Sequence, residues 1–213
     1  MPILPAEPMI FPGNLLDVEP GFPNGDEPSA ANDVLSEPVL SGCRWFVAHT
    51  RPRQEKALAR YLFSRHIAYF LPQSSHLPHL HRHKESYIPI FTGYVFLRTS
   101  ATGTLDAMKS NRIAAMLRVP DQARLQADLQ RVKRLIESRL PLYAEQQLLP
   151  GRPVRIVAGP LMGMTGIIES RPGPCRFIVA VDFIGQGVSV DLDARSIEPL
   201  EAEAVAVPIG SPK

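Results

Sequence analysis

The fold of this chain is decided by the stretch Ile90–Arg98, which reads IFTGYVFLR. From Tyr94 onward the residues alternate as in a β-strand, with Val95 and Leu97 on one face and Tyr94 and Phe96 on the other. Val95 and Leu97 are predicted to lie in the core. The aromatic face either packs beneath a helix of the same chain or forms a docking surface, because aromatic side chains dominate both cores and interfaces.

The composition indicates a soluble globular protein. The chain has 213 residues, enough for two modest domains, and an apolar fraction of 45% allows a hydrophobic core. No apolar run approaches the length of a membrane span, and no basic patch precedes an apolar segment in the first residues. Two cysteines are too few for a disulfide framework. We therefore expect a reduced, cytoplasmic protein without membrane contact.

Charge is distributed unevenly along the chain. Residues 1–43 hold seven acidic side chains and no Lys or Arg, whereas residues 44–140 carry a net charge of +11. Residues 141–213 have a net charge of −2. A strongly basic middle region is typical of a protein that lies against a phosphate backbone, although a solvated basic surface without a partner is the alternative.

Proline, glycine and hydrophobic periodicity divide the chain into parts. Residues 1–43 are rich in proline and acidic side chains and are predicted to be a disordered tail. Residues 44–140 alternate strand and helix patterns, which predicts an α+β sandwich with helices packed on one sheet. Residues 141–150 are predicted to be a flexible linker. Residues 151–201 contain five short strand patterns that predict a small β-barrel, followed by a tail at 202–213.

The order of these motifs resembles that of the NusG/RfaH family of transcription factors. In residues 44–138 the likeness rests on Trp45-Phe46-Val47, on a helix within 51–65, and on Ile90–Arg98, which is similar to the family's Phe-Pro-Gly-Tyr-Val strand. Residues 152–200 resemble a KOW domain. The resemblance implies a bacterial elongation factor that binds RNA polymerase, suppresses pausing and regulates termination or antitermination. Thr92 in place of proline and the acidic tail suggest a specialised, RfaH-like branch.

The resemblance also implies which residues of the first domain contact the polymerase. The positions that match the surface for the β′ clamp helices are Trp45, Phe91, Tyr94 and Phe96. The positions near the segment that reaches the gate loop of the β subunit are Thr104, Leu105 and Asp106. The basic residues predicted to contact the nucleic-acid backbone of the elongation complex are Arg53, Arg60, Arg82, Lys84 and Arg112.

In housekeeping members of the family the barrel contacts either the termination factor Rho or a small-subunit ribosomal protein. The positions that match this partner surface are Leu161, Met164, Phe183, Ile184 and Gln186. The family favours phenylalanine at the first two and arginine at the last, so the ribosomal protein is the better expectation than Rho. RfaH-type barrels can refold into helices, but β-branched residues and Gly/Pro turns predict a stable all-β barrel here.

No catalytic or metal motif is recognisable. There is no Ser-His-Asp, Cys-His or paired-carboxylate arrangement and no phosphate-binding loop, so neither an enzyme nor a cofactor is expected. The histidine cluster His76, His79, His81 and His83 fits no established zinc spacing, which favours a solvated or phosphate-facing loop over a metal site. We expect a monomer. The competing function class is a KOW-containing RNA-binding or ribosome-associated protein.

Overall fold

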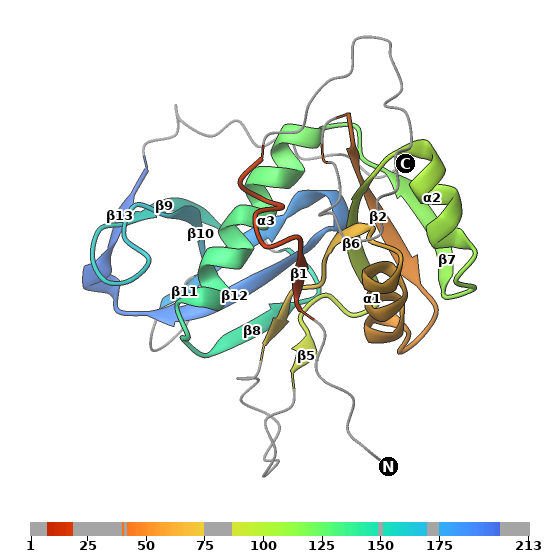
Figure 1. The fold of residues 1–213 in the computed structure, drawn as a ribbon. Helices are drawn as coiled ribbons and strands as arrows, with labels where there is room; N and C mark the ends of the chain where they lie inside the picture. Colours follow the sequence, from red (N-terminus) through yellow and green to blue (C-terminus); the bar gives the residue numbers. More distant parts are fainter. Residues whose placement is uncertain are drawn as a thin grey trace, which may run out of the picture. The chain divides into compact units, whose positions relative to one another are not determined.

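The computed structural model describes residues 8–18, 40, 42–74, 87–148, 151–169 and 175–200 (Figure 1). They form two compact units that divide between Gln130 and Arg131, within the last helix of the first unit. The sequence predicted this boundary near residue 140. Residues of the helix beyond the division belong to the second unit, within which the Arg134 guanidinium donates to the Met162 carbonyl at 2.6 Å.

The first unit is built on an antiparallel sheet of five strands in the order β1-β3-β6-β2-β7. The strands are β1 (Ile10–Phe11), β2 (Arg44–Thr50), β3 (Ala68–Phe70), β6 (Tyr94–Thr99) and β7 (Ile113–Arg118). A separate pair joins β4 (Gln73–Ser74) to β5 (Ile88–Pro89). Strand β6 is central, and its residues from Val95 to Thr99 are all buried, as expected for the strand on which the domain is organised.

Two helices cover one face of this sheet and α3 covers the other (Figure 1). Beneath α1 (Glu55–Ser64), Leu58 and Leu62 form a buried cluster with Val95 and Leu97, which confirms the predicted core positions. Helix α2 (Ala101–Met108) begins at Ser100, whose hydroxyl accepts a hydrogen bond from the amide of Gly103 at 3.2 Å.

Helix α3 (Gln122–Glu137) is amphipathic, as its sequence predicts. The carboxylate of Asp121 accepts a hydrogen bond from the amide of Arg124 at 2.9 Å, which confirms Asp121 as the predicted cap. Leu125 and Leu129 are buried, and Gln126 of the same helix face bonds to the indole of Trp45. The aromatic face of the sheet therefore lies against a helix of its own chain.

The prediction of an unstructured tail is wrong for residues 8–18. Strand β1 pairs with β3, with Ile10 opposite Phe70 and Phe11 opposite Tyr69. Leu15 and Leu16 are fully buried. The prolines of this segment prevent a long helix or strand. They still allow a two-residue strand and two leucines to pack on the domain formed by residues that follow much later in the chain. The rest of the predicted tail, apart from residues 40, 42 and 43, lies outside the described residues.

The second unit is an antiparallel sheet in the order β13-β9-β10-β11-β12-β8. Its strands are β8 (Leu142–Glu145), β9 (Arg152–Ile156), β10 (Thr165–Glu169), β11 (Cys175–Val181), β12 (Gln186–Leu192) and β13 (Ile197–Pro199). Five of them match the predicted strands of the small barrel. Valines at alternate positions of β11, Val179 and Val181, are fully buried and form its core together with Val188, which pairs with Val179 from β12. The predicted turn at residues 172–174 and the tail 202–213 lie outside the described residues.

Strand β8 lies inside the predicted linker, so residues 142–145 are not a flexible connection. They pair with β12 in the register Leu142 to Val190 through Glu145 to Gly187. Leu142 is buried, and it follows Pro141, which had suggested a break in structure. The sequence did not reveal this strand because four residues are too few for the alternation of a strand to be recognised without its partner.

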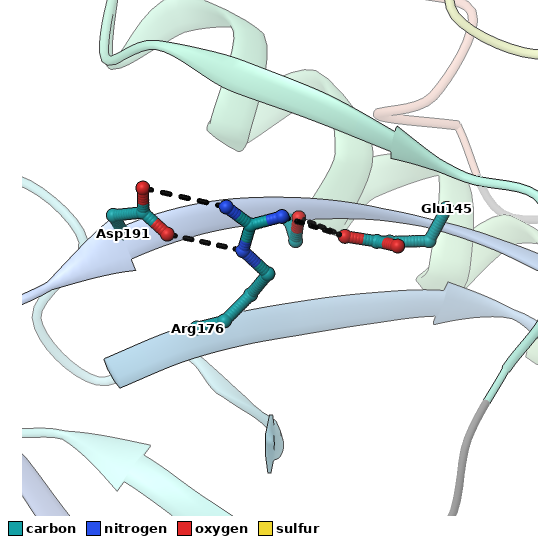
Figure 2. Close-up of polar contacts among 4 residues, drawn as sticks. Glu145, Arg176 and Asp191 are labelled. Carbon is teal, nitrogen blue, oxygen red and sulfur yellow. Dashed lines mark hydrogen bonds and ion pairs between the residues drawn. The ribbon is translucent and has the colours of Figure 1, made fainter. Parts of the chain in front are cut away.

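A polar cluster on one face holds β8 on the sheet of the second unit (Figure 2). Arg176 of β11 donates to Asp191 of β12 at 3.1 Å and lies 3.5 Å from the Glu145 carboxylate of β8. Its guanidinium also stacks 4.2 Å from the centre of the Tyr143 ring. The Ser189 hydroxyl donates to Glu145 from the intervening strand. Partial burial alone would lower the pKa of Arg176, but the hydrogen bond to Asp191 and the nearby carboxylates raise it.

None of the helices in the described part of the chain combines the length and apolar character needed to cross a membrane.

Candidate functional site

The aromatic face of the sheet consists of three rows of side chains that run across β2 and β6. The rows are set by the strand register, which places Trp45 opposite Arg98, Val47 opposite Phe96, and His49 opposite Tyr94. Directly opposed residues of antiparallel strands project from the same face. The three rows therefore form one continuous surface on the side of the sheet that faces α3.

The Trp45–Arg98 row is closed. Trp45 is fully buried, and its indole nitrogen donates to the side-chain oxygen of Gln126 at 3.0 Å. The guanidinium of Arg98 lies 6.0 Å from the centre of the Trp45 ring, and only 1% of Arg98 is exposed. Burial lowers the pKa of Arg98, because desolvation disfavours its charged form.

Phe91 and Phe96 are also buried, and their rings meet edge to face with centroids 5.9 Å apart. The prediction that Trp45, Phe91, Tyr94 and Phe96 form an exposed docking surface is therefore wrong for three of the four side chains in this conformation. The alternative interpretation, burial beneath a helix, describes them correctly. Alternation along a strand cannot distinguish a covered apolar face from an open one, because both need the same residues.

The His49–Tyr94 row is the accessible end of the face. His49 is exposed and Tyr94 partly exposed, with ring centroids 5.2 Å apart. Gly93 precedes Tyr94 with a φ of +85°, and its carbonyl accepts from the Thr50 amide at 2.8 Å. The buried Glu55 carboxylate accepts from the Gly93 amide at 2.7 Å. Sequence reasoning missed His49, although alternation from Trp45 along β2 would have placed it beside Tyr94.

Basic side chains flank this open end. The backbone amide of Arg51, two residues after His49, donates to the carbonyl of Arg112 at 2.9 Å, which brings the loop after β2 against the start of β7. Arg53 lies in the same loop, with an unusual φ of +61°, and is exposed. Arg112, another of the predicted backbone-binding residues, bonds through its guanidinium to the side chain of Gln54, the residue after Arg53.

The other predicted phosphate-binding residues are placed differently. Arg60 lies exposed on α1, in a different element from Arg53 and Arg112. Arg82 and Lys84 lie outside the described residues, as do His76, His79, His81 and His83. Among the residues that the structure describes, no three His, Cys, Asp or Glu side chains gather as metal ligands would.

On α2, one of the three residues predicted to contact the gate loop has a side chain that is largely exposed to solvent. Leu105 is 67% exposed, and Met108, one turn further along the same helix, is also exposed. The hydroxyl of Thr104 instead donates to the carbonyl of Ser100 at 3.0 Å. The carboxylate of Asp106 pairs with Lys109 at 3.0 Å. Leu105 is therefore the residue of this set that can contact a partner without losing an internal bond.

In the second unit, some of the residues predicted to contact a partner are buried and others are partly exposed. Leu161 and Met164 are buried, so the prediction that they face a partner is wrong. They lie in the turn between β9 and β10, where the adjacent Met162 is 60% exposed. Phe183 and Ile184 are partly exposed in the 3₁₀ turn Asp182–Ile184. The buried side-chain oxygen of Gln186 has no hydrogen-bond partner among the described residues.

Comparisons with known proteins bear on the first unit. Residues 43–143 match the protein-family model described as "Transcription termination factor nusG". No curated protein sequence matches the chain at a significant level. A solved structure titled "Domain interaction in Thermotoga maritima NusG" is 18% identical, with a TM-score of 0.44, and the match covers 75% of this chain and 98% of that chain.

A second solved structure, titled "Crystal Structure of MjSpt4:Spt5 complex conformation B", is 16% identical with a TM-score of 0.29. That match covers 73% of this chain and 96% of the other. The family model covers the sheet of the first unit from β2 onward, together with its three helices. Residues 43–143, just under half of the chain, are therefore similar to the NusG family of transcription factors.

Proposed function

We propose that this protein is a non-enzymatic transcription elongation factor that binds RNA polymerase, suppresses pausing and regulates termination or antitermination. The observation that carries the proposal is the open end of the aromatic face, where His49 and Tyr94 lie side by side in a domain of the NusG family. An aromatic pair at the end of an otherwise buried face suits a protein interface, because aromatic anchors supply much of the binding energy at such sites.

In this proposal Tyr94 and His49 contact the clamp helices of the β′ subunit. Arg53 and Arg112 flank them and face the phosphates of the nucleic acid that the polymerase holds. Contacts with phosphates fix position without reading sequence, so the basic flank would strengthen binding at any transcribed site. The exposed Leu105 on α2 would reach the β subunit gate loop, so that one domain bridges the two sides of the channel.

We assign the barrel to a partner outside the polymerase, with Phe183 and Ile184 as the contact. An apolar contact of this kind favours a small-subunit ribosomal protein over Rho, because Gln186 has no charge where the family has arginine. The six paired strands of the second unit support a stable β fold. Strand β8 shortens the connection after α3 to residues 138–141 and stabilises the β form, which makes refolding to helices unfavourable.

The decisive experiment compares Tyr94→Ala with Tyr87→Ala, since Tyr87 is also exposed but lies before β5 rather than on the aromatic face. Affinity for purified bacterial RNA polymerase core enzyme is measured by biolayer interferometry, and pausing by single-round transcription. Loss of an aromatic anchor costs about 2 kcal/mol, so Tyr94→Ala should bind roughly 30-fold more weakly than Tyr87→Ala.

Equal polymerase affinity for the two folded variants would contradict the assignment of the site. Binding of the wild-type protein to ribosomes but not to polymerase would instead support the alternative, a ribosome-associated KOW protein.

A further inference from the structure

The segment Pro8–Val18 lies over the closed end of the aromatic face. In Figure 1 it runs beside α3, after strand β1 has joined the edge of the sheet. Leu15 and Leu16 are fully buried, whereas Val18 at the end of the segment is 37% exposed. These residues come from outside the region that matches the family model, which begins at residue 43.

Three side chains of the domain hold the backbone of residues 15–18, the end of this segment. Arg98 donates to the carbonyl of Leu15 at 3.2 Å and to that of Val18 at 2.6 Å. Gln126 donates to the carbonyl of Leu16 at 3.1 Å and to that of Val18 at 2.8 Å. Gln130, one turn further along α3, donates to the Leu16 carbonyl at 2.7 Å.

The same side chains belong to the aromatic face. Arg98 stacks on Trp45, and Gln126 accepts the hydrogen bond of the Trp45 indole while it donates to the segment. The segment therefore seals the row of the face that lies furthest from the open His49–Tyr94 end. Its release would return the Arg98 guanidinium to solvent at this end of the face, while α3 stays in place on Trp45.

We propose that Pro8–Val18 is an autoinhibitory lid, and that the protein binds RNA polymerase more tightly when this lid is released. The inference rests on the proposed function, because it assigns a regulator to the same docking face. A site that is open in only part of the molecules binds with an affinity reduced by the open fraction. The lid would thus set the affinity of the site without contacting the partner.

The way the segment is held makes release feasible. Its strand contributes only two paired residues. The other backbone bonds to the domain are single hydrogen bonds, from the side chains of Arg98, Gln126, Gln130 and Tyr69 and from the amide of Leu71 to the carbonyl of Met9. Fixing the backbone of a segment costs conformational entropy at every residue, which offsets much of the gain from burying two leucines. Desolvation of Arg98 opposes the closed state further, and rehydration of the guanidinium favours opening.

The test uses the full chain and two variants of the lid. Leu16→Asp places a charge in a fully buried position and should release the lid, whereas Val18→Asp adds the same charge at an exposed position of the same segment and serves as the matched control. Gln130→Ala is the milder variant, because it removes one bond to the Leu16 carbonyl from an exposed site on α3.

Hydrogen exchange of the free protein reports on the lid without any partner. Leu16→Asp and Gln130→Ala should speed exchange in residues 9–18 while leaving β2 and β6 protected, and Val18→Asp should change neither. In binding to RNA polymerase core enzyme, Leu16→Asp should have an affinity about tenfold higher than Val18→Asp, as for a lid that is closed in nine molecules of ten.

The outcomes separate the two ideas. If no variant binds polymerase, the proposed function fails, while the exchange data still show whether the segment opens on its own. If the wild-type protein binds and the Leu16→Asp and Gln130→Ala variants bind no more tightly than Val18→Asp, the lid is overturned. Exchange in residues 9–18 that occurs only with unfolding of the whole domain would also overturn it.

Discussion

The indole nitrogen of Trp45 donates a hydrogen bond of 3.0 Å to the side chain of Gln126, 81 positions away in sequence. One turn earlier on α3, Gln122 donates to the Trp45 carbonyl at 3.1 Å and accepts from its amide. Strand β7 pairs with β2 only from Phe46 onward. The side-chain amide of Gln122 therefore bonds to the backbone of Trp45 in place of the strand that has ended. Two glutamines thus fix α3 on the aromatic face.

Replacement of Gln126 by leucine should destabilise the first unit. The variant leaves the buried indole of Trp45 and the carbonyl of Leu16 without this partner, and an unsatisfied buried polar group costs about 1–3 kcal/mol. Urea denaturation followed by tryptophan fluorescence measures the loss, because Trp45 is the only tryptophan of the chain. Gln147→Leu, at an exposed glutamine, is the control and should leave the midpoint unchanged.

Replacement of Arg176 by alanine should loosen strand β8. The change removes the ion pairs with Asp191 and Glu145 and the stacking on Tyr143. Amide exchange in residues 142–145 should become about tenfold faster, which corresponds to about 1.4 kcal/mol of local stability. Arg195→Ala, at an exposed arginine of the same unit, should not alter this exchange. Fast exchange of 142–145 already in the wild-type protein would show that β8 is not held by this cluster.

Replacement of Gly166 by alanine should disrupt the barrel for steric reasons. An added Cβ would lie 2.6 Å from the backbone oxygen of Ile178 and 2.6 Å from the ring of Phe177. Because the neighbouring backbone cannot move freely, the expected loss is about 1–3 kcal/mol of unfolding free energy. Gly13→Ala is the matched control, since a Cβ there meets nothing within 4 Å. Equal melting temperatures of the two variants would contradict the predicted clash.

Charge reversal at Arg53 and Arg112 should weaken binding to nucleic acid. If both contact phosphates, the double variant Arg53→Glu/Arg112→Glu should bind a single-stranded DNA probe less tightly and with a salt dependence reduced by about one to two units of slope. Fluorescence anisotropy at several salt concentrations measures both quantities. Arg195→Glu, which makes a comparable change on the barrel, should leave the slope near that of the wild type. A wild-type affinity that is insensitive to salt would exclude phosphate contacts.

The sequence by itself determined the elements and their inner faces. Alternation in Tyr94–Arg98 predicted Val95 and Leu97 as core, and Asp121 predicted the start of α3, because strand period and helix capping act between residues close in sequence. Five strand patterns between glycine and proline turns likewise predicted the second domain. Each of these features is local, and the structure agrees with each of them.

Only the tertiary structure decided which faces are covered. Trp45 is buried beneath α3, whose Gln122 and Gln126 bond to it, whereas His49 at the other end of β2 is exposed beside Tyr94. Residues 142–145 form a strand because they pair with β12 and because Arg176 forms an ion pair with Glu145. Burial and strand pairing depend on residues far apart in the chain, so composition and periodicity alone leave them undecided.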